Sequence, residues 1–155
     1  MITRRTFIAG AAATAFAAPA ILRAQTIWRD YPFSLGVAAG DPAPDGFVIW
    51  TRLAPDPLDL HGGMAMSPMP VSWEVADDTR FANVVARGEA VARPELAHSV
   101  HVEVSGLQPD RPYWYRFNAG GEQSFNGRAR TLPAPGTSPE SLRFGVCGCQ
   151  SYEDG

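Results

Sequence analysis

Two cysteines near the end of the 155-residue chain are the side chains best suited to chemistry. Cys147 and Cys149 are separated by one residue and follow the apolar run 142–146. A disulfide between them would close a ring too small for ordinary disulfide geometry. A thiolate just past the end of a core strand could bind a metal, and a buried, inert cysteine fits the same pattern equally well. The residues alone leave both interpretations open.

Two histidines and two aspartates are weaker candidates for a metal site. His98 and His101 are three apart on a predicted strand, so they would lie on opposite faces and cannot share a metal there. We expect them to face solvent or to lie in loops. Asp41 and Asp45 could bind a cation, but Asp-Pro and Asp-Gly pairs are commoner as turn formers.

Two arginines complete the set of candidates. Arg128 and Arg130 are two apart, which places them on one face of a strand. A phosphate clamp is conceivable there, although a solvated sheet face is the commoner use of such a pair. The region 28–131 contains no recognisable catalytic constellation.

Short strands are the elements that would position these side chains. Apolar and polar residues alternate with a period of two, and clusters of Gly, Pro, Asp and Asn separate the runs. No helix of any length is evident between Trp28 and Leu132. The pattern predicts an all-β fold, an antiparallel sandwich of fibronectin type III or immunoglobulin-like type with about seven strands. The predicted strands are 33–38, 47–53, 71–75, 83–91, 100–105, 113–117 and 124–131.

Several aromatic residues are predicted to belong to the core of this sandwich. The strict alternation of 71–75 turns Trp73 inward with the valines on either side of it. Tyr113 stands where a tyrosine corner is expected, with its hydroxyl directed to upstream backbone and Leu107 plugging the corner. Trp50 fits the tryptophan on the second strand of such modules, and we expect it in the core rather than in a ligand-stacking platform.

The longest irregular stretch runs from 54 to 70 and holds His61, three methionines and four prolines. It is too long for a hairpin turn. A functional loop and a disordered surface excursion both fit it.

The amino terminus is predicted to be an export signal. Arg4 and Arg5 precede the alanine-rich apolar run 7–18, and small residues follow it, the pattern of a twin-arginine signal peptide over 1–24. The run is shorter than the roughly 20 apolar residues of a spanning helix, so we expect no stable membrane span. An uncleaved, anchored signal is the alternative. The signal implies the twin-arginine translocase as a partner and a periplasmic or extracellular location.

The charge of the chain disfavours nucleic acid as a partner. The formal net charge is −3, from 13 basic and 16 acidic residues. Removal of the signal takes Arg4, Arg5 and Arg23 away and leaves 10 basic residues against 16 acidic ones, a net charge of about −6. An acidic surface is a poor electrostatic match for a phosphate backbone.

A domain boundary is predicted after Thr131. The segment 132–140 is rich in proline and polar residues, the composition of an interdomain linker. A new apolar strand begins after it, within 141–155. A linker followed by one strand is not a domain, so we expect this chain to be a truncated piece of a longer protein.

Several motifs together resemble the PhoD-type alkaline phosphatases. They are the twin-arginine signal and the segments 35–42, 44–55, 71–76, 113–117 and 142–144, the last leading into 149–153, with 40–55 the most specific. The resemblance implies a fibronectin-like amino-terminal domain over 28–131, followed by an α/β metallophosphoesterase domain of which 141–155 is only the start.

The same resemblance implies an activity and a metal ligand. Members of the family hydrolyse phosphomonoesters and phosphodiesters with an iron–calcium centre, and the position that binds iron corresponds to Cys149. Cys147 departs from the small residue usual there. The remaining ligands, carboxylates, an asparagine and histidines, would follow Gly155, so we expect the 155-residue piece to be inactive alone. One thiolate cannot build a multi-metal centre.

A stand-alone secreted module that binds a partner is the alternative function. Such a module should expose an aromatic cluster, for which Trp114 and Phe125 are the candidates. An apolar strand at 142–147 would then be an orphan edge prone to aggregation, which disfavours this alternative.

Overall fold

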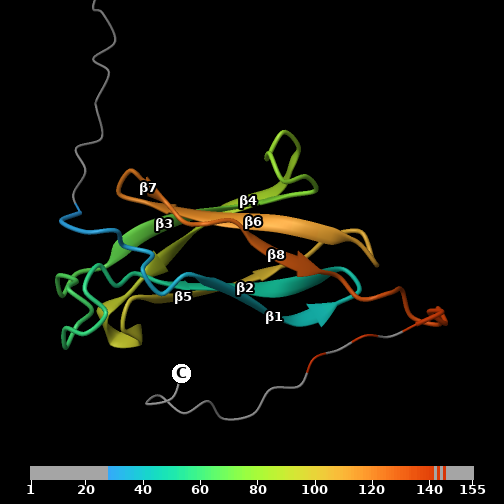
Figure 1. Ribbon diagram of the computed structural model, residues 1–155, viewed down its shortest axis with the longest axis horizontal. Coiled ribbons are helices and arrows are strands. Elements are labelled where there is room, and N and C mark those ends of the chain that lie inside the picture. The colour runs from blue at the N-terminus through green and yellow to red at the C-terminus, as the bar shows by residue number, and fades with distance from the viewer. Residues whose placement is uncertain (1–27, 142, 144, 146–155) are drawn as a thin grey trace, which may run out of the picture.

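A computed structural model describes residues 28–141, 143 and 145. They form a two-layered β-sandwich, with one sheet above the other in Figure 1. The elements are β1 (Val37–Ala43), β2 (Gly46–Arg52), β3 (Met69–Ala76), β4 (Val84–Ala92), a single 3₁₀ turn (Pro94–Leu96), β5 (Ser99–Val104), β6 (Pro112–Ala119), β7 (Glu122–Gln123) and β8 (Gly127–Arg130).

All strand pairs are antiparallel. One sheet has the order β1-β2-β5, and the other has the order β4-β3-β6-β7, with β8 also pairing with β6. The predicted antiparallel sandwich is therefore confirmed. No helix in the described part of the chain is long and apolar enough to span a membrane.

Two predicted strands differ in extent from the observed ones. The run 33–38 becomes a strand only at Val37, because the backbone N–H of Gly36 bonds the carbonyl of Phe33 and closes a turn. Within the predicted strand 124–131 only β8 forms, because the segment 124–126 leaves the ladder: the Ser124 hydroxyl accepts the N–H of Phe117 and donates to the carbonyl of Phe125.

The core lies between the sheets and contains most of the predicted residues. Trp73 packs against it from β3, between the fully buried Val71 and Val75. Tyr113 is 2% exposed, and its hydroxyl accepts a hydrogen bond from the Gln108 backbone N–H at 2.9 Å, so the tyrosine corner is confirmed. Leu107 is buried beside it.

The placement of Trp50 in the core is wrong. On β2 the buried side chains are Phe47, Ile49 and Thr51, and Trp50 alternates with them on the other face. Its cross-strand neighbour His101 is exposed on the same outer face. A shift of one residue in a strand reverses every side chain, so a pattern of two adjacent apolar residues does not settle which one faces inward.

Candidate functional site

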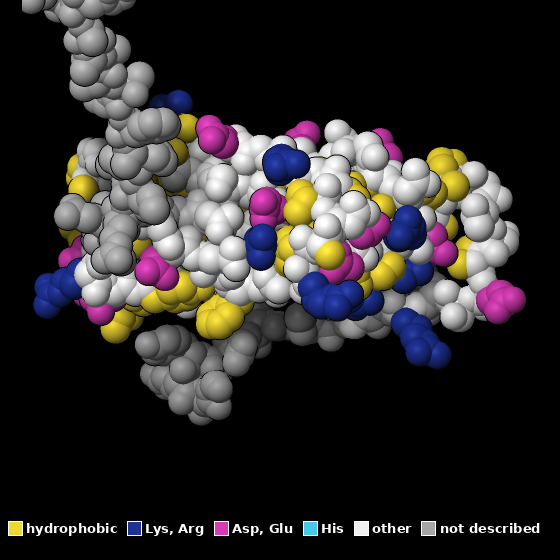
Figure 2. All heavy atoms as spheres, turned by 90° about the horizontal axis from the view of Figure 1, so that it is seen from above, with side chains coloured by type: hydrophobic (Ala, Val, Ile, Leu, Met, Phe, Trp, Pro, Cys, Tyr) yellow, Lys and Arg dark blue, Asp and Glu magenta, His cyan; other side chains and the backbone are white. Residues whose placement is uncertain are grey.

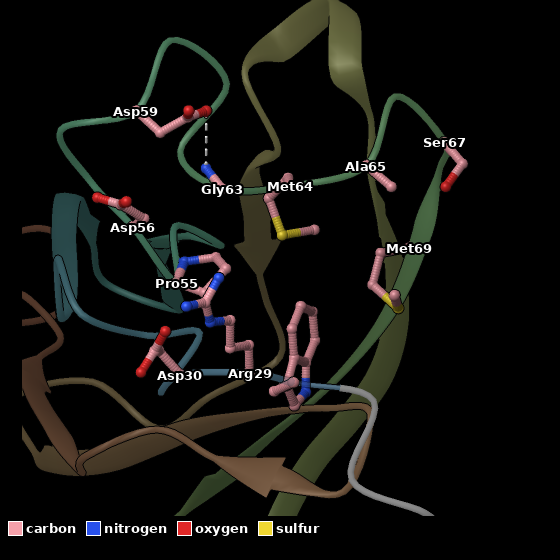
Figure 3. Close-up of a pocket in the computed structure, with 11 residues that line it drawn as sticks. Arg29, Asp30, Pro55, Asp56, Asp59, Gly63, Met64, Ala65, Ser67 and Met69 are labelled. Carbon is pink, nitrogen blue, oxygen red and sulfur yellow. Dashed lines mark hydrogen bonds between the residues drawn. The ribbon is translucent and has the colours of Figure 1, made fainter.

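One end of the sandwich carries a cavity of about 650 Å³ beneath the long loop that joins β2 to β3. Loop residues form most of its wall, and the segment that leads into β1 supplies Arg29 and Asp30 (Figure 3). The lining residues are Trp28, Arg29, Asp30, Pro55, Asp56, Asp59, Gly63, Met64, Ala65, Ser67 and Met69.

The loop over this cavity is held by its own hydrogen bonds. The Asp59 carboxylate accepts bonds from the backbone N–H groups of His61 at 2.9 Å and Gly63 at 3.2 Å (Figure 3). These bonds, that from His61 first, lower the pKa of Asp59 below its ordinary value. The Asp56 N–H bonds the Gly62 carbonyl at 3.0 Å and closes the loop. The segment 54–70 is thus an ordered loop, which contradicts its interpretation as a disordered surface excursion.

Buried contacts fasten the loop to the sandwich. Met64 is 9% exposed and belongs to the core cluster. His98 is buried and its Nε2–H donates to the Ser67 carbonyl at 3.1 Å. Trp28 donates from its indole N–H to the Ala119 carbonyl at 2.8 Å, which anchors the other wall. These contacts tie both walls of the cavity to the sandwich.

The described lining of this cavity offers charged, polar and apolar side chains that could contact a ligand. Its described lining has aspartates, an arginine and two methionines but neither histidine nor cysteine. Within the described residues, no group of three or more His, Cys, Asp or Glu side chains could hold a metal ion. Among the described lining residues, no hydrogen bond joins the Ser67 hydroxyl to a carboxylate, the arrangement by which a base activates a nucleophile.

The two histidines identified from the sequence lie in different environments. His98 precedes β5 rather than lying on it, with a backbone φ of 56°, so its placement on a strand is wrong. It is a buried loop residue, whereas His101 is exposed on β5. The structure does not bring them together as a ligand pair.

The aspartates and arginines named from the sequence lie elsewhere. Asp41 lies within β1 at a shift in its register with β2, and Asp45 lies in the β1–β2 turn, where its carbonyl accepts the N–H of Leu107. Arg128 and Arg130 are both exposed on one side of β8. Arg130 pairs with Asp110 at 2.8 Å, so the two guanidiniums do not form a free phosphate clamp.

The predicted metal ligand and the predicted signal fall outside the described residues. Cys149, Cys147 and the segment 1–24 are all in that part of the chain. The residues around the cavity were missed by sequence reasoning, although one signal was available. Asp59-Leu60-His61-Gly62-Gly63 is a sequence in which an aspartate can bond backbone N–H groups two and four residues on, and two glycines allow the positive φ of 68° and 72°.

Comparison with known proteins decides the family. The family model described as PhoD-like phosphatase, N-terminal domain, matches residues 17–133, which is more than half of the chain. The chain belongs to the PhoD-like phosphatase family. The resemblance drawn from the sequence motifs is thereby confirmed.

Two individual PhoD-like proteins extend this comparison. Alkaline phosphatase D of Bacillus subtilis (strain 168) is 47% identical over 162 residues, which cover 98% of this chain and 28% of the relative. A solved structure of PhoD is 54% identical, with a TM-score of 0.71, over 72% of this chain and 21% of that one. The chain thus spans little more than a quarter of the length of the curated relative it matches.

Proposed function

We propose that this chain is the amino-terminal part of an exported PhoD-like alkaline phosphatase and phosphodiesterase that hydrolyses phosphate esters. The observation that carries the proposal is the 47% identity to alkaline phosphatase D over 98% of the chain. The described sandwich offers a binding cavity but no hydrolytic constellation, so the catalytic residues belong to the part of the parent that follows.

The proposed organisation has four parts. Residues 1–24 are a twin-arginine signal that directs the protein to the periplasm or the exterior through the twin-arginine translocase. Residues 28–131 are the fibronectin-like domain, 132–140 are the linker and 141–155 begin the metallophosphoesterase domain. The parent uses iron and calcium, and Cys149 is the one ligand of that centre that this chain supplies. The metals polarise the phosphoryl oxygens and activate the nucleophile.

Turnover of a chromogenic phosphodiester tests this proposal. The parent chain, produced with iron and calcium, should hydrolyse the substrate and lose activity when a chelator is added. The 155-residue chain under the same conditions should show only the background rate. Metal-dependent turnover by the 155-residue chain, or none by the parent, contradicts the proposal.

A secreted binding module is the second candidate, and exposed apolar side chains favour it. Phe125 is 72% exposed and stacks edge-on against Tyr31 with ring centroids 5.7 Å apart. Leu58, Leu60 and Met66 are exposed on the long loop between β2 and β3. Trp114 is only partly exposed on β6. A stop codon directly after Gly155 in the natural reading frame would favour this candidate over the enzyme.

A further inference from the structure

The outer face of the three-stranded sheet has a tryptophan at its centre. Register places Ala38, Trp50 and His101 in one row across β1, β2 and β5, and Gly40, Val48 and Glu103 in the next row. The rings of Trp50 and His101 lie 6.5 Å apart. Trp50 is partly exposed, and tryptophan, with tyrosine and arginine, is enriched at the energetic centres of interfaces. We call these six residues the Trp50 face.

Small residues open one side of the Trp50 face. Ala38 and Gly40 are exposed on β1, which is the edge strand of its sheet. A Cβ built on Gly40 would have no heavy atom within 4 Å among the described residues. Another part of a protein can therefore approach the β1 backbone closely and reach the flank of the Trp50 indole.

The outer face of the other sheet carries many charged and polar side chains. Glu74 and Arg116 form an ion pair at 2.7 Å, and the Arg116 guanidinium lies 4.1 Å from the centroid of the Phe81 ring. Gln123 donates to Asn118 at 3.0 Å. Figure 2 shows this side of the molecule, where basic and acidic side chains are interspersed with apolar ones. Arg87, Glu89 and Arg128 add further exposed charges to this face, and a partner docking there would have to remove water from them.

The path of the chain leads toward the Trp50 face. Leu132 donates its N–H to the carbonyl of Ala43, so the linker begins beside the end of β1. A turn then bonds Thr137 N–H to the Ala134 carbonyl, with Gly136 at a φ of 81°. After this turn the described chain heads back on the side of the three-stranded sheet (Figure 1). The match leaves most of the length of a curated relative uncovered.

We propose that the Trp50 face is the surface on which the catalytic domain of the parent protein docks. This inference rests on the proposed function, because it requires that domain to follow the linker. The domain inserts apolar or cationic side chains between Trp50 and the small residues of β1. Docking holds the two domains in one relative orientation rather than leaving them to move about a nine-residue linker.

Small-angle scattering of the metal-loaded full-length protein tests the docking. Trp50→Ala removes the central contact, and Ala38→Arg adds a bulky charge beside it without removing any buried group. Both variants should release the domains and lengthen the maximum dimension by up to about 30 Å, the reach of nine extended residues. Ala38→Arg keeps the test valid if Trp50→Ala fails to fold.

Two variants on the opposite sheet serve as matched controls. Trp114→Ala removes an outward tryptophan from β6, and Val85→Arg adds a charge at an exposed position of β4. Neither should change the maximum dimension. A maximum dimension unaltered by both Trp50→Ala and Ala38→Arg overturns the docking proposal, as does an equal change in the controls.

The outcomes separate this inference from the proposed function. If the wild type hydrolyses a phosphodiester and the Trp50 face variants scatter like the wild type, the docking proposal is wrong and the proposed function stands. Absence of turnover removes the function whatever the scattering shows. If the wild type is a dimer that these variants dissociate, the Trp50 face joins two copies of the chain and the docking proposal is overturned.

Discussion

Tyr113 and Tyr115 occupy equivalent places on β6, and each is 2% exposed. The Tyr113 hydroxyl accepts a bond from the Gln108 N–H and faces the Gln108 carbonyl at 3.4 Å. Burial raises the pKa of Tyr115 to about 12, with no hydrogen bond from a described residue to oppose it. Tyr113→Phe should therefore lower the free energy of unfolding by about 1–2 kcal/mol.

Tyr115→Phe is the control for that substitution, because it removes a hydroxyl from the same strand without breaking a described hydrogen bond. Urea denaturation followed by circular dichroism compares the two. Tyr115→Phe should leave the unfolding midpoint nearly unchanged. An equal loss in both variants would mean that the corner hydrogen bond contributes nothing specific.

The sequence predicted the position of the Tyr113 side chain correctly and that of Trp50 incorrectly. The tyrosine corner depends on the short spacing from Leu107 to Tyr113, and a motif this local can be recognised in a single sequence. The side to which Trp50 points depends on the register of β2 against β1 and β5, which is a long-range property. His98 was equally hard to place, because its burial depends on Ser67, 31 residues away.

At the scale of the strands, Gly88 is required by the packing of β4 on β3. Gly88 lies opposite Trp73, and a Cβ there would lie 2.7 Å from the Trp73 ring. Gly88→Ala should lower the free energy of unfolding by about 1–3 kcal/mol, because the indole must leave its place against the core. Chemical denaturation measures the change.

Gly40→Ala on β1 is the matched control, since a Cβ there meets nothing within 4 Å in the described structure. Alanine also loses less conformational freedom on folding than glycine. The control should therefore be as stable as the wild type or slightly more so. Equal destabilisation of the two variants would show that the glycines act through backbone freedom and not through the Trp73 contact.

The loop 54–70 depends on Asp59. Asp59→Ala removes the acceptor of two backbone N–H groups, whereas Asp56→Ala removes one bond, at 3.3 Å to the Leu58 N–H. Thermolysin should cut the loop about fivefold faster in Asp59→Ala, because the open form becomes more populated, and Asp56→Ala should change the rate little. Equal rates in the two variants would contradict this.

The same carboxylate predicts a pH dependence. The pKa of Asp59 is lowered in the fold from 3.8, so its contribution is complete above pH 3.8 and is lost as the pH falls through the lowered value. Pepsin cleavage within the loop should therefore accelerate below pH 3.8 in the wild type. In Asp59→Ala this particular acceleration should be absent.

At the scale of the whole molecule, the sequence predicted the sandwich because alternation and turn residues recur along the chain. The cavity under the loop was not predicted, because it is formed by segments near residues 28–30 and 55–69 that only the folded chain brings together. The ligands of the metal centre that we propose are spread still more widely along the sequence. Under that proposal, most of them come from the part of the parent after Gly155.

Two serine substitutions in the full-length parent test the one ligand assigned to this chain. Cys149→Ser removes the thiolate that we expect to bind iron, and Cys147→Ser makes the same atomic change two residues earlier. Replacing partners that only support metal ligands costs 10–100-fold in many enzymes, so loss of a ligand should lower phosphodiester turnover by about 100-fold or more. Iron content, measured by elemental analysis, should fall with it.

Cys147→Ser should retain iron and turnover, and both variants should keep the circular dichroism of the wild type. A thiolate binds iron only when deprotonated, so the iron retained by the wild type should also decline at acidic pH, whereas Cys149→Ser has no such thiolate to protonate. Loss of iron in Cys147→Ser, with iron retained in Cys149→Ser, would identify Cys147 as the iron ligand. Full iron in both variants would remove the thiolate from the centre and, with it, the assignment of any metal ligand to residues 1–155.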